Sequence, residues 1–324
     1  MNMKLLLASV ALASAACASL AQAQTYPQKP VRMIIPFAPG GASDFVGRII
    51  QPKMGELLGQ QIVIDNRAGA AGNIGVEAAA KAPPDGYTML LGNIGTIAIN
   101  PAVLPMSVDT VRDLIAVSQV ADVPSILVAH PRLPSNSVDE FVALAKSKPG
   151  ALNYASPGPS TMNRLEMERF MKTTGISMVH VPYKGSAGPA VTGLLGGETQ
   201  VMFVTLVSAS NFVKAGKLKA FALTTRTRVE TLPEVPTMIE SGFPEWVSSS
   251  WQGMFFPQGV PRAAVMRIHD DLVKTLEAPD VMQRFAAGGA IAASSKTPEE
   301  FASYVAAEHA RWGKLAKEVG ATND

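Results

Sequence analysis

Three times in this chain a β-like run leads into a turn of glycine, proline and hydroxyl residues, and a helical pattern follows. These turns occupy residues 36–44, 156–161 and 183–189. Strands that alternate with helices at this spacing predict a mostly parallel sheet with helices on both faces. Each turn also directs the free N–H groups of a helix start toward the carboxyl edge of a sheet, which favours an anion. The pattern therefore predicts an α/β protein with anion-binding loops.

The first turn, residues 36–44, is not a nucleotide-binding motif. It contains neither Gly-x-Gly-x-x-Gly nor Gly-x-x-x-x-Gly-Lys-Ser/Thr. The preceding run 31–35 predicts a strand, and the apolar pattern over 45–58, which Gly59 can end, predicts a helix. Two glycines in such a turn are often turn chemistry alone, so the prediction of an anion site also depends on the two later turns.

The first 23 residues have the pattern of a secretory signal. Lys4 precedes a short apolar run over 5–13, and the Ala-Gln-Ala sequence at 21–23 is a cleavage site. The run is too short to anchor the chain in a bilayer. Lipid attachment at Cys17 is the less favoured alternative, because small residues precede this cysteine. We therefore expect export to the periplasm and a mature chain without a thiol.

Removal of 23 of the 324 residues leaves 301, a length that suits two domains. The formal charge of +2 falls to +1 without Lys4, and no basic run indicates nucleic acid. The apolar stretch 114–128, broken by Asp-Val-Pro at 122–124, predicts two strands and a first crossing between domains. Residues 246–251 predict the return crossing. We expect lobe 1 to comprise 24–122 with 250–324, and lobe 2 to comprise 123–249.

Loops at two sheet edges that face each other across a hinge would form a cleft for a small anion. The four histidines lack metal-ligand spacing, and the chain has no Gly-x-Ser-x-Gly nucleophile motif. We therefore expect no metal site, no cofactor and no catalytic residue.

Several runs, taken in order, resemble one protein family. They are Ile-Ile-Pro-Phe-Ala-Pro-Gly-Gly-Ala-Ser-Asp at 34–44, Asp-Asn-Arg-x-Gly-Ala-x-Gly at 65–72, Pro-Asp-Gly-Tyr-Thr at 84–88, Val-Pro-Tyr-Lys-Gly at 181–185, and Leu-Pro-Glu-Val-Pro-Thr at 232–237. Together they resemble the Bug family, also called TctC-like, which comprises the extracytoplasmic solute receptors of tripartite tricarboxylate transporters. The resemblance extends over essentially the whole mature chain.

This resemblance implies a type II periplasmic-binding-protein fold, in which two α/β lobes are joined by two crossover strands and the ligand lies between them. It implies a small organic acid as ligand and the integral-membrane permease subunits of the transporter as partners. We expect a monomer that binds no nucleic acid. The resemblance also implies that two loops act as pincers on a ligand carboxylate, through backbone N–H groups and ordered water.

The candidate ligand-binding residues follow from these loops. The first pincer contributes Phe37, Ala38, Gly40, Gly41, Ser43 and Asp44, and the second contributes Tyr183, Gly185, Ser186 and Ala187. The remaining candidates follow other strands: Asn93, Ser156, Ser160, Thr161 and Thr205. Asp44 would repel a bound carboxylate, so a role for it requires a water, hydroxyl or amine between them. Many family members have aspartate at the position of Val204, which here leaves Thr205 as the nearest polar residue.

Three other functions remain as alternatives to a transport receptor. A two-lobed receptor can signal through a membrane partner, and a two-lobed periplasmic enzyme can act on a small acid. The effector domain of a transcriptional regulator shares the fold, but the export signal and the lack of a helix-turn-helix pattern argue against it. The sequence leaves the ligand open among dicarboxylates, citrate-like acids, aromatic acids, amino acids and nicotinate-like compounds.

Overall fold

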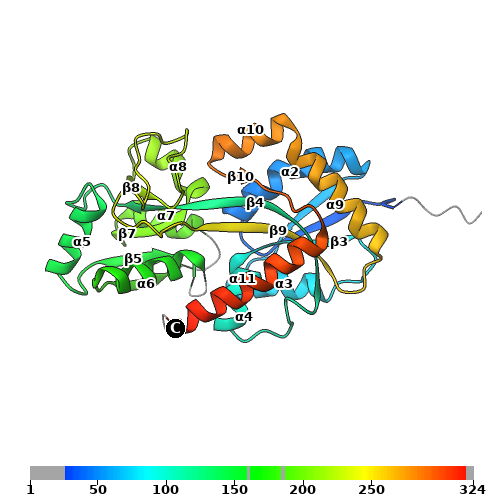
Figure 1. The fold of residues 1–324 in the computed structure, drawn as a ribbon, viewed down its shortest axis with the longest axis horizontal. Coiled ribbons are helices and arrows are strands. Elements are labelled where there is room, and N and C mark those ends of the chain that lie inside the picture. Colours follow the sequence, from blue (N-terminus) through cyan, green and yellow to red (C-terminus); the bar gives the residue numbers. More distant parts are fainter. Residues whose placement is uncertain (1–25, 159–160, 184–186, 319–324) are drawn as a thin grey trace, which may run out of the picture.

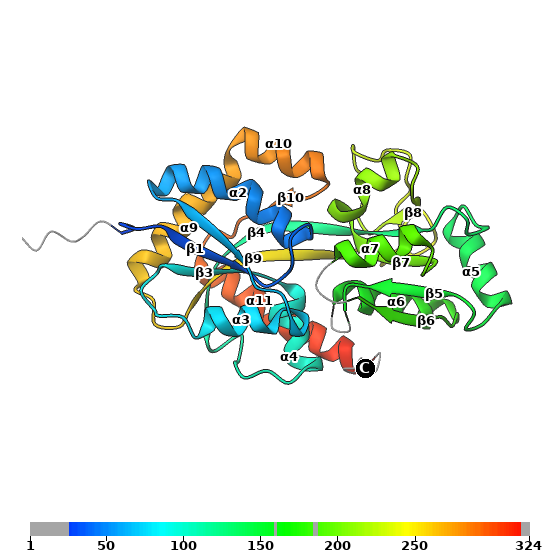
Figure 2. The ribbon, with the colours of Figure 1, turned by 180° about the vertical axis from the view of Figure 1, so that it is seen from behind.

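The computed structural model describes residues 26–158, 161–183 and 187–318. Two α/β halves lie side by side along the long axis of the molecule, and strands β4 (Leu114–Ala129) and β9 (Ser249–Pro257) run between them (Figures 1 and 2). The first half is built from the segments before β4 and after β9, whereas the second half is formed by the segment between them.

The sheet of the first half has the strand order β2-β1-β3-β9-β4. Strands β1 (Val31–Ile35), β2 (Ile62–Asn66) and β3 (Thr88–Asn93) are parallel, as predicted. Strand β9 lies antiparallel between β3 and β4, and the short β10 (Ile291–Ala292) pairs with β4. The carboxyl ends of β1 and β3 therefore lie at the same edge of this sheet.

The sheet of the second half continues from β4 in the order β4-β7-β5-β6. Strands β5 (Asn153–Ser156), β6 (Val179–Pro182) and β7 (Val201–Thr205) are parallel, and β4 is antiparallel to β7. Strand β8 (Lys219–Leu223) pairs antiparallel with β4. The loops that follow β5, β6 and β7 thus start from one edge of the second sheet.

Strand β4 is continuous, so the prediction of two strands broken at 122–124 was wrong. Residues up to Pro124 pair with β9, where Pro124 lies opposite Ser249, and from Ser125 onward β4 pairs with β7. Proline cannot donate a ladder hydrogen bond. Pro124 is accommodated because it lies where one pairing ends and the next begins.

Helices cover both faces of the first sheet, as predicted. On one face α2 (Ala42–Leu58), α9 (Arg262–Glu277) and α10 (Pro279–Gly288) pack on a continuous apolar core. On the other face α3 (Asn73–Ala80) and α11 (Pro298–Glu318) enclose a second core. The second core also includes two apolar side chains from the start of α6 in the other half, so apolar packing crosses between the halves.

The second sheet is covered in the same way. Helices α5 (Val138–Ser147) and α6 (Met162–Thr174) pack on one core, and α7 (Ala187–Gly196) and α8 (Leu206–Lys214) pack on the other. Helix α8 was not predicted, and neither was α10. The remaining described elements are a 3-10 turn at Ala70–Gly72, a π-helical segment at Gly95–Ile99 and the short α4 (Asn100–Val103).

Single residues account for several helix ends, among them the end of α2 that was predicted at Gly59. Gly59 and Gly175 adopt the left-handed conformation after α2 and α6, with φ of 67° and 70°. Ser137 caps α5 by accepting a hydrogen bond from the N–H three residues on, at 3.2 Å. Thr297 caps α11 through the N–H of Glu300, also at 3.2 Å.

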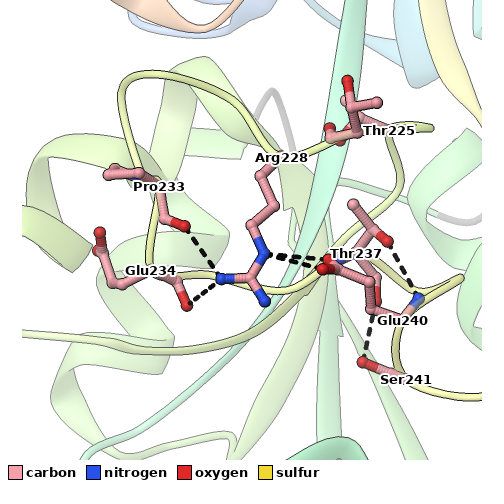
Figure 3. Close-up of polar contacts among 8 residues, drawn as sticks. Thr225, Arg228, Pro233, Glu234, Thr237, Glu240 and Ser241 are labelled. Atoms are coloured by element: carbon pink, nitrogen blue, oxygen red, sulfur yellow. Dashed lines mark hydrogen bonds and ion pairs between the residues drawn. The ribbon is translucent and has the colours of Figure 1, made fainter.

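The long connection between β8 and β9 folds around Arg228 (Figure 3). The Arg228 guanidinium donates to both carboxylate oxygens of Glu240 and to the carbonyl oxygens of residues 233 and 234. Leu232 and Val235 of this connection are buried in the core beneath α7 and α8, and the arginine closes the loop around them.

Candidate functional site

A cavity at the beginnings of several helices lies between the two halves. It is lined by the starts of α2, α6 and α7, by the ends of β3 and β7, and by the beginning of β9. Among the predicted residues, those that line it are Phe37, Gly41, Ser43, Asn93, Thr161, Ala187 and Thr205. None of the described lining residues carries a charged side chain. An anion there would be held by N–H groups and neutral side chains.

The first wall of the cavity is the turn that precedes α2. Gly41 occupies the N-cap position, with φ of −91° and ψ of 178°, and no side chain caps the helix. The first N–H groups of a helix have no partner within it. The N–H groups of Ala42 and Ser43, which follow Gly41 in the cavity wall, are therefore free of intrahelical partners.

Asp44 supports this turn from outside the cavity. Its carboxylate accepts hydrogen bonds from the Gly40 N–H at 3.0 Å, from Arg48 Nε at 2.9 Å and from Asn66 Nδ2 at 3.2 Å. Burial alone would raise the pKa of Asp44, but these donors hold it below its ordinary value. Asp44 is not among the residues that line the cavity. Its contacts are those of a group that shapes the turn.

A buried polar network connects the first wall to β9. Ser43 donates through its hydroxyl to Gln252 Oε1 at 2.7 Å, and Asn93 Nδ2 lies 3.5 Å from Ser43 Oγ. Gln252 in turn donates to Ser250 Oγ at 3.2 Å. Each of these side chains forms a hydrogen bond with another member of the network. The network therefore fixes α2, β3 and β9 relative to one another.

The third part of the first wall is the loop 69–72. Ala70 and Ala71 have φ values of 46° and 55°, a conformation that costs free energy for any residue with a Cβ atom. Asn100 Nδ2 donates to the Ala71 carbonyl at 3.0 Å, which helps to hold this shape. Ala71 lines the cavity. Backbone strain of this kind often accompanies a functional site.

The second half contributes helix starts. Thr161 caps α6 by accepting from the Arg164 N–H, and its hydroxyl donates to the Gly158 carbonyl at 2.9 Å. Thr205 ends β7 immediately before α8, and Ala187 begins α7. The N-termini of these three helices therefore approach the same cavity as that of α2.

Other predicted residues do not line the cavity. Ser156 is buried, and its Oγ lies 2.7 Å from His180 Nε2. The Tyr183 hydroxyl donates to Glu198 at 2.7 Å, where the lack of a side chain at Gly193 leaves room for the ring. Besides Asp44, the predicted residues of the first turn that lie outside the cavity wall are Ala38 and Gly40. The predicted residues that fall outside the described ranges are Ser160, Gly185 and Ser186.

Sequence reasoning missed several lining residues. Ala71 belongs to a glycine-rich loop that the family pattern contains, so its position was signalled indirectly. Asn100, Asn163 and Ser250 had no such signal, since polar residues within helices and strands are common. Their presence in the wall depends on contacts between distant parts of the chain.

The described ranges contain no group of three His, Cys, Asp or Glu side chains that could hold a metal ion. Within the same ranges, no helix has the length and apolar composition that crossing a bilayer requires.

The model of the TctC family, described as the tripartite tricarboxylate transporter family receptor, matches residues 46–321. The chain belongs to this family. Protein BugT of Bordetella pertussis is 36% identical over 325 residues, which covers 99% of each chain. The predicted resemblance to the Bug family is thereby confirmed.

Solved structures of other proteins show the same fold. The periplasmic binding protein BugD matches with a TM-score of 0.83 at 31% identity, covering 92% of this chain and 100% of that one. R. palustris Rpa4515 with adipate matches with a TM-score of 0.88 at 32% identity, covering 92% of this chain and 99% of that one. MatC from Rhodopseudomonas palustris with bound malate matches with a TM-score of 0.83 at 30% identity, covering 90% of this chain and 99% of that one.

The predicted two-lobed periplasmic-binding-protein fold is therefore confirmed. This Bug protein belongs to a family of extracytoplasmic solute-binding receptors.

Proposed function

We propose that this receptor is exported, captures a small carboxylate-bearing metabolite between its two halves, and delivers it to the membrane permease subunits of a tripartite tricarboxylate transporter. The observation that supports this proposal most directly is the composition of the cavity wall. The N-termini of α2, α6, α7 and α8 meet there, and no described lining residue is charged. In this proposal residues 1–23 are the signal that directs export.

A carboxylate suits this cavity for physical reasons. Free N–H groups and the positive ends of helix dipoles stabilise an anion without a cationic side chain. Phosphate and sulfate would be stabilised by N–H groups and helix dipoles in the same way. The similar structures of Rpa4515 and MatC, however, are described with the carboxylates adipate and malate. In this proposal Gly41 and Ser43 contact the ligand from one side, and Thr161, Ala187 and Thr205 contact it from the other.

The lobes in this proposal are residues 24–122 with 250–324, and residues 123–249. The change of pairing at Pro124 and Ser125, opposite the start of β9, supports a hinge there. A ligand that touches both lobes binds the closed state more tightly than the open state, so it shifts the population toward closure.

Binding in this proposal occurs without turnover, in a monomer that needs no cofactor. The described cavity wall offers no histidine, cysteine, lysine or acidic side chain as a general base or nucleophile. Affinity then comes from the N–H groups and from exclusion of water when the lobes close.

Purified chain from residue 24 would test this function by thermal-shift screening of a carboxylate library, followed by calorimetry on the hits. We expect at least one small acid to raise the melting temperature through preferential binding to the folded state. The neutral carboxamide of the same acid should not bind. Absence of any carboxylate ligand, or steady product formation from one, would contradict the proposal.

A further inference from the structure

Asn163 lines the cavity from the second residue of α6 and is almost fully buried. Its amide nitrogen donates to Ser125 Oγ and to Glu166 Oε2, both at 3.1 Å. A primary amide has two N–H hydrogens, so both are committed to these partners. The carbonyl oxygen Oδ1 is therefore the group that Asn163 can offer to a ligand.

Glu166 fixes this orientation of the amide. When Glu166 is ionised its carboxylate only accepts hydrogen bonds, so a turned amide would then place Oδ1 against a carboxylate oxygen and leave both without a donor. Glu166 is 4% exposed, and such an arrangement would have little water to relieve it. The buried acid therefore determines which end of the amide remains available to a ligand.

The position of Glu166 is itself fixed at the connections between the halves. The Ser248 hydroxyl, just before β9, donates to its other oxygen, Oε1. Ser125, the other partner of Asn163, lies at the point where β4 changes partners. Ser125 on β4 and Ser248 next to β9 thus both contribute to the orientation of a single amide in the cavity wall.

The rest of the polar wall includes many donors. Ala42 and Ser43 present helix N–H groups, and the helix starts of the second half add more. A carboxylate requires such donors. Asn163 differs from them, because a carboxylate oxygen placed against its Oδ1 would be repelled.

We infer that Asn163 is a specificity-determining residue that accepts a hydrogen bond from the ligand, and that Glu166 is the residue that positions it. This inference rests on the proposed carboxylate-binding function. The ligand then carries, beside its carboxylate, a hydrogen-bond donor such as a hydroxyl or an ammonium group. Hydroxy acids and amino acids meet this requirement, whereas unsubstituted mono- and dicarboxylates do not.

Acids that differ by one group provide the test. Calorimetry at about pH 8 would compare three series, each with one unsubstituted acid and its hydroxy and amino derivatives. In the first series, succinate is compared with malate and aspartate. In the other two, glutarate is compared with 2-hydroxyglutarate and glutamate, and propionate with lactate and alanine. In any series that binds, we expect a donor-bearing acid to bind at least about tenfold more tightly than the unsubstituted acid, the effect of one hydrogen bond. Comparison of the hydroxy acid with the amino acid in each series shows whether the site binds a hydroxyl or an ammonium donor.

Equal or tighter binding of the unsubstituted acid would overturn this inference and leave the proposed function intact. If no acid in any series binds and the wider library yields no carboxylate, the proposed function fails, and this inference fails with it.

Variants separate the specificity role from a structural one. Asn163→Ala removes the acceptor, so the ratio of the two affinities should fall to about one while the unsubstituted acid still binds. Glu166→Met fills a similar space without an acceptor and should lower the ratio in the same direction. Glu166→Gln keeps a carbonyl oxygen for the Asn163 amide and should retain the ratio. The assignment of Asn163 as the acceptor would be contradicted if the ratio of the two affinities were unchanged in Asn163→Ala. The positioning role of Glu166 would be contradicted if Glu166→Met and Glu166→Gln lowered this ratio equally.

Discussion

Asp44 and Glu166 are buried carboxyl groups whose pKa values move in opposite directions. Burial alone would raise the pKa of Asp44, but the three donors around it together lower it. Burial dominates at Glu166 and raises its pKa to about 7, although hydrogen bonds from serine and asparagine oppose the shift. Asp44 therefore adds stability that is lost as the pH falls through its lowered pKa, whereas the contribution of Glu166 is lost as the pH rises.

Glu166→Gln should make the unfolding free energy less dependent on pH above about pH 5. The folded wild-type protein holds the Glu166 proton more tightly than the unfolded chain does, so raising the pH from the ordinary pKa of 4.5 through about 7 destabilises it. The difference between these two pKa values, about 2.5 units, corresponds to a change in unfolding free energy of about 3 to 4 kcal/mol at most. Urea unfolding of both proteins from about pH 5 to about pH 8 would measure this effect. Parallel curves would contradict the raised pKa.

Replacement of Gly41 by valine should weaken ligand binding far more than it lowers stability. The φ of −91° and ψ of 178° at Gly41 suit a β-branched residue, while the added side chain would occupy the cavity wall. We expect at least a tenfold loss of affinity, about 1.4 kcal/mol or more, and a change in unfolding free energy below about 1 kcal/mol. Calorimetry and urea unfolding would measure the two effects.

Gly40→Val is the matched comparison. Gly40 has a φ of 88°, which strains any residue with a Cβ atom, although no atom lies within 4 Å of the added group. This variant should therefore lose about 1–2 kcal/mol of stability through strain. Wild-type affinity in Gly41→Val would show that this turn does not contact the ligand.

Among the secondary-structure elements, β9 and α11 approach each other closely at Gly253. A Cβ atom there would overlap the ring of Phe301, which is fully buried. Gly253→Ala should lower the unfolding free energy by about 1–3 kcal/mol through overpacking. Gly196→Ala, at the end of α7 with no atom within 4 Å, is the control and should be nearly neutral. Equal effects in urea unfolding would contradict the close approach.

The elements that could be predicted are those whose limits are set by local chemistry. Gly59 and Gly175 end their helices because a left-handed residue there closes the last turn. Helix α8 was missed because it follows β7 without an intervening glycine or proline. Helix α10 begins at Pro279, directly after α9, where a proline indicates the end of one helix but also suits the first position of the next.

The candidate site was predictable in part for the same reason. Ser43 and Thr161 occupy helix starts that the turn pattern reveals, and both line the cavity. Asn163 and Ser250 were not foreseen, since their roles in the wall depend on partners in other elements. The hydrogen bond between Ser43 and Gln252 joins residues 209 positions apart, which no local pattern can indicate.

In the whole molecule, the two connecting strands should make the distance between the halves respond to ligand. Glu56→Cys on α2 and Lys148→Cys after α5 would place fluorescent labels on opposite halves. Cys17 is the only natural cysteine, so a chain that starts at residue 24 carries no other thiol. Saturating ligand should narrow the distribution of energy transfer and shift it toward one state. An unchanged distribution would contradict binding linked to closure.

The place of β9 between β3 and β4 in the first sheet also determines the order in which the molecule can be completed. The described strands of the second half all end before residue 224, whereas β9, which separates β3 from β4, begins only at Ser249. A growing chain therefore holds the strands of the second half before the first sheet has the strand that joins β3 to β4. Contacts of such long range form slowly. A chain cut short before β9 would leave β3 and β4 without their shared neighbour, and the cavity would lack the wall that Ser250 contributes.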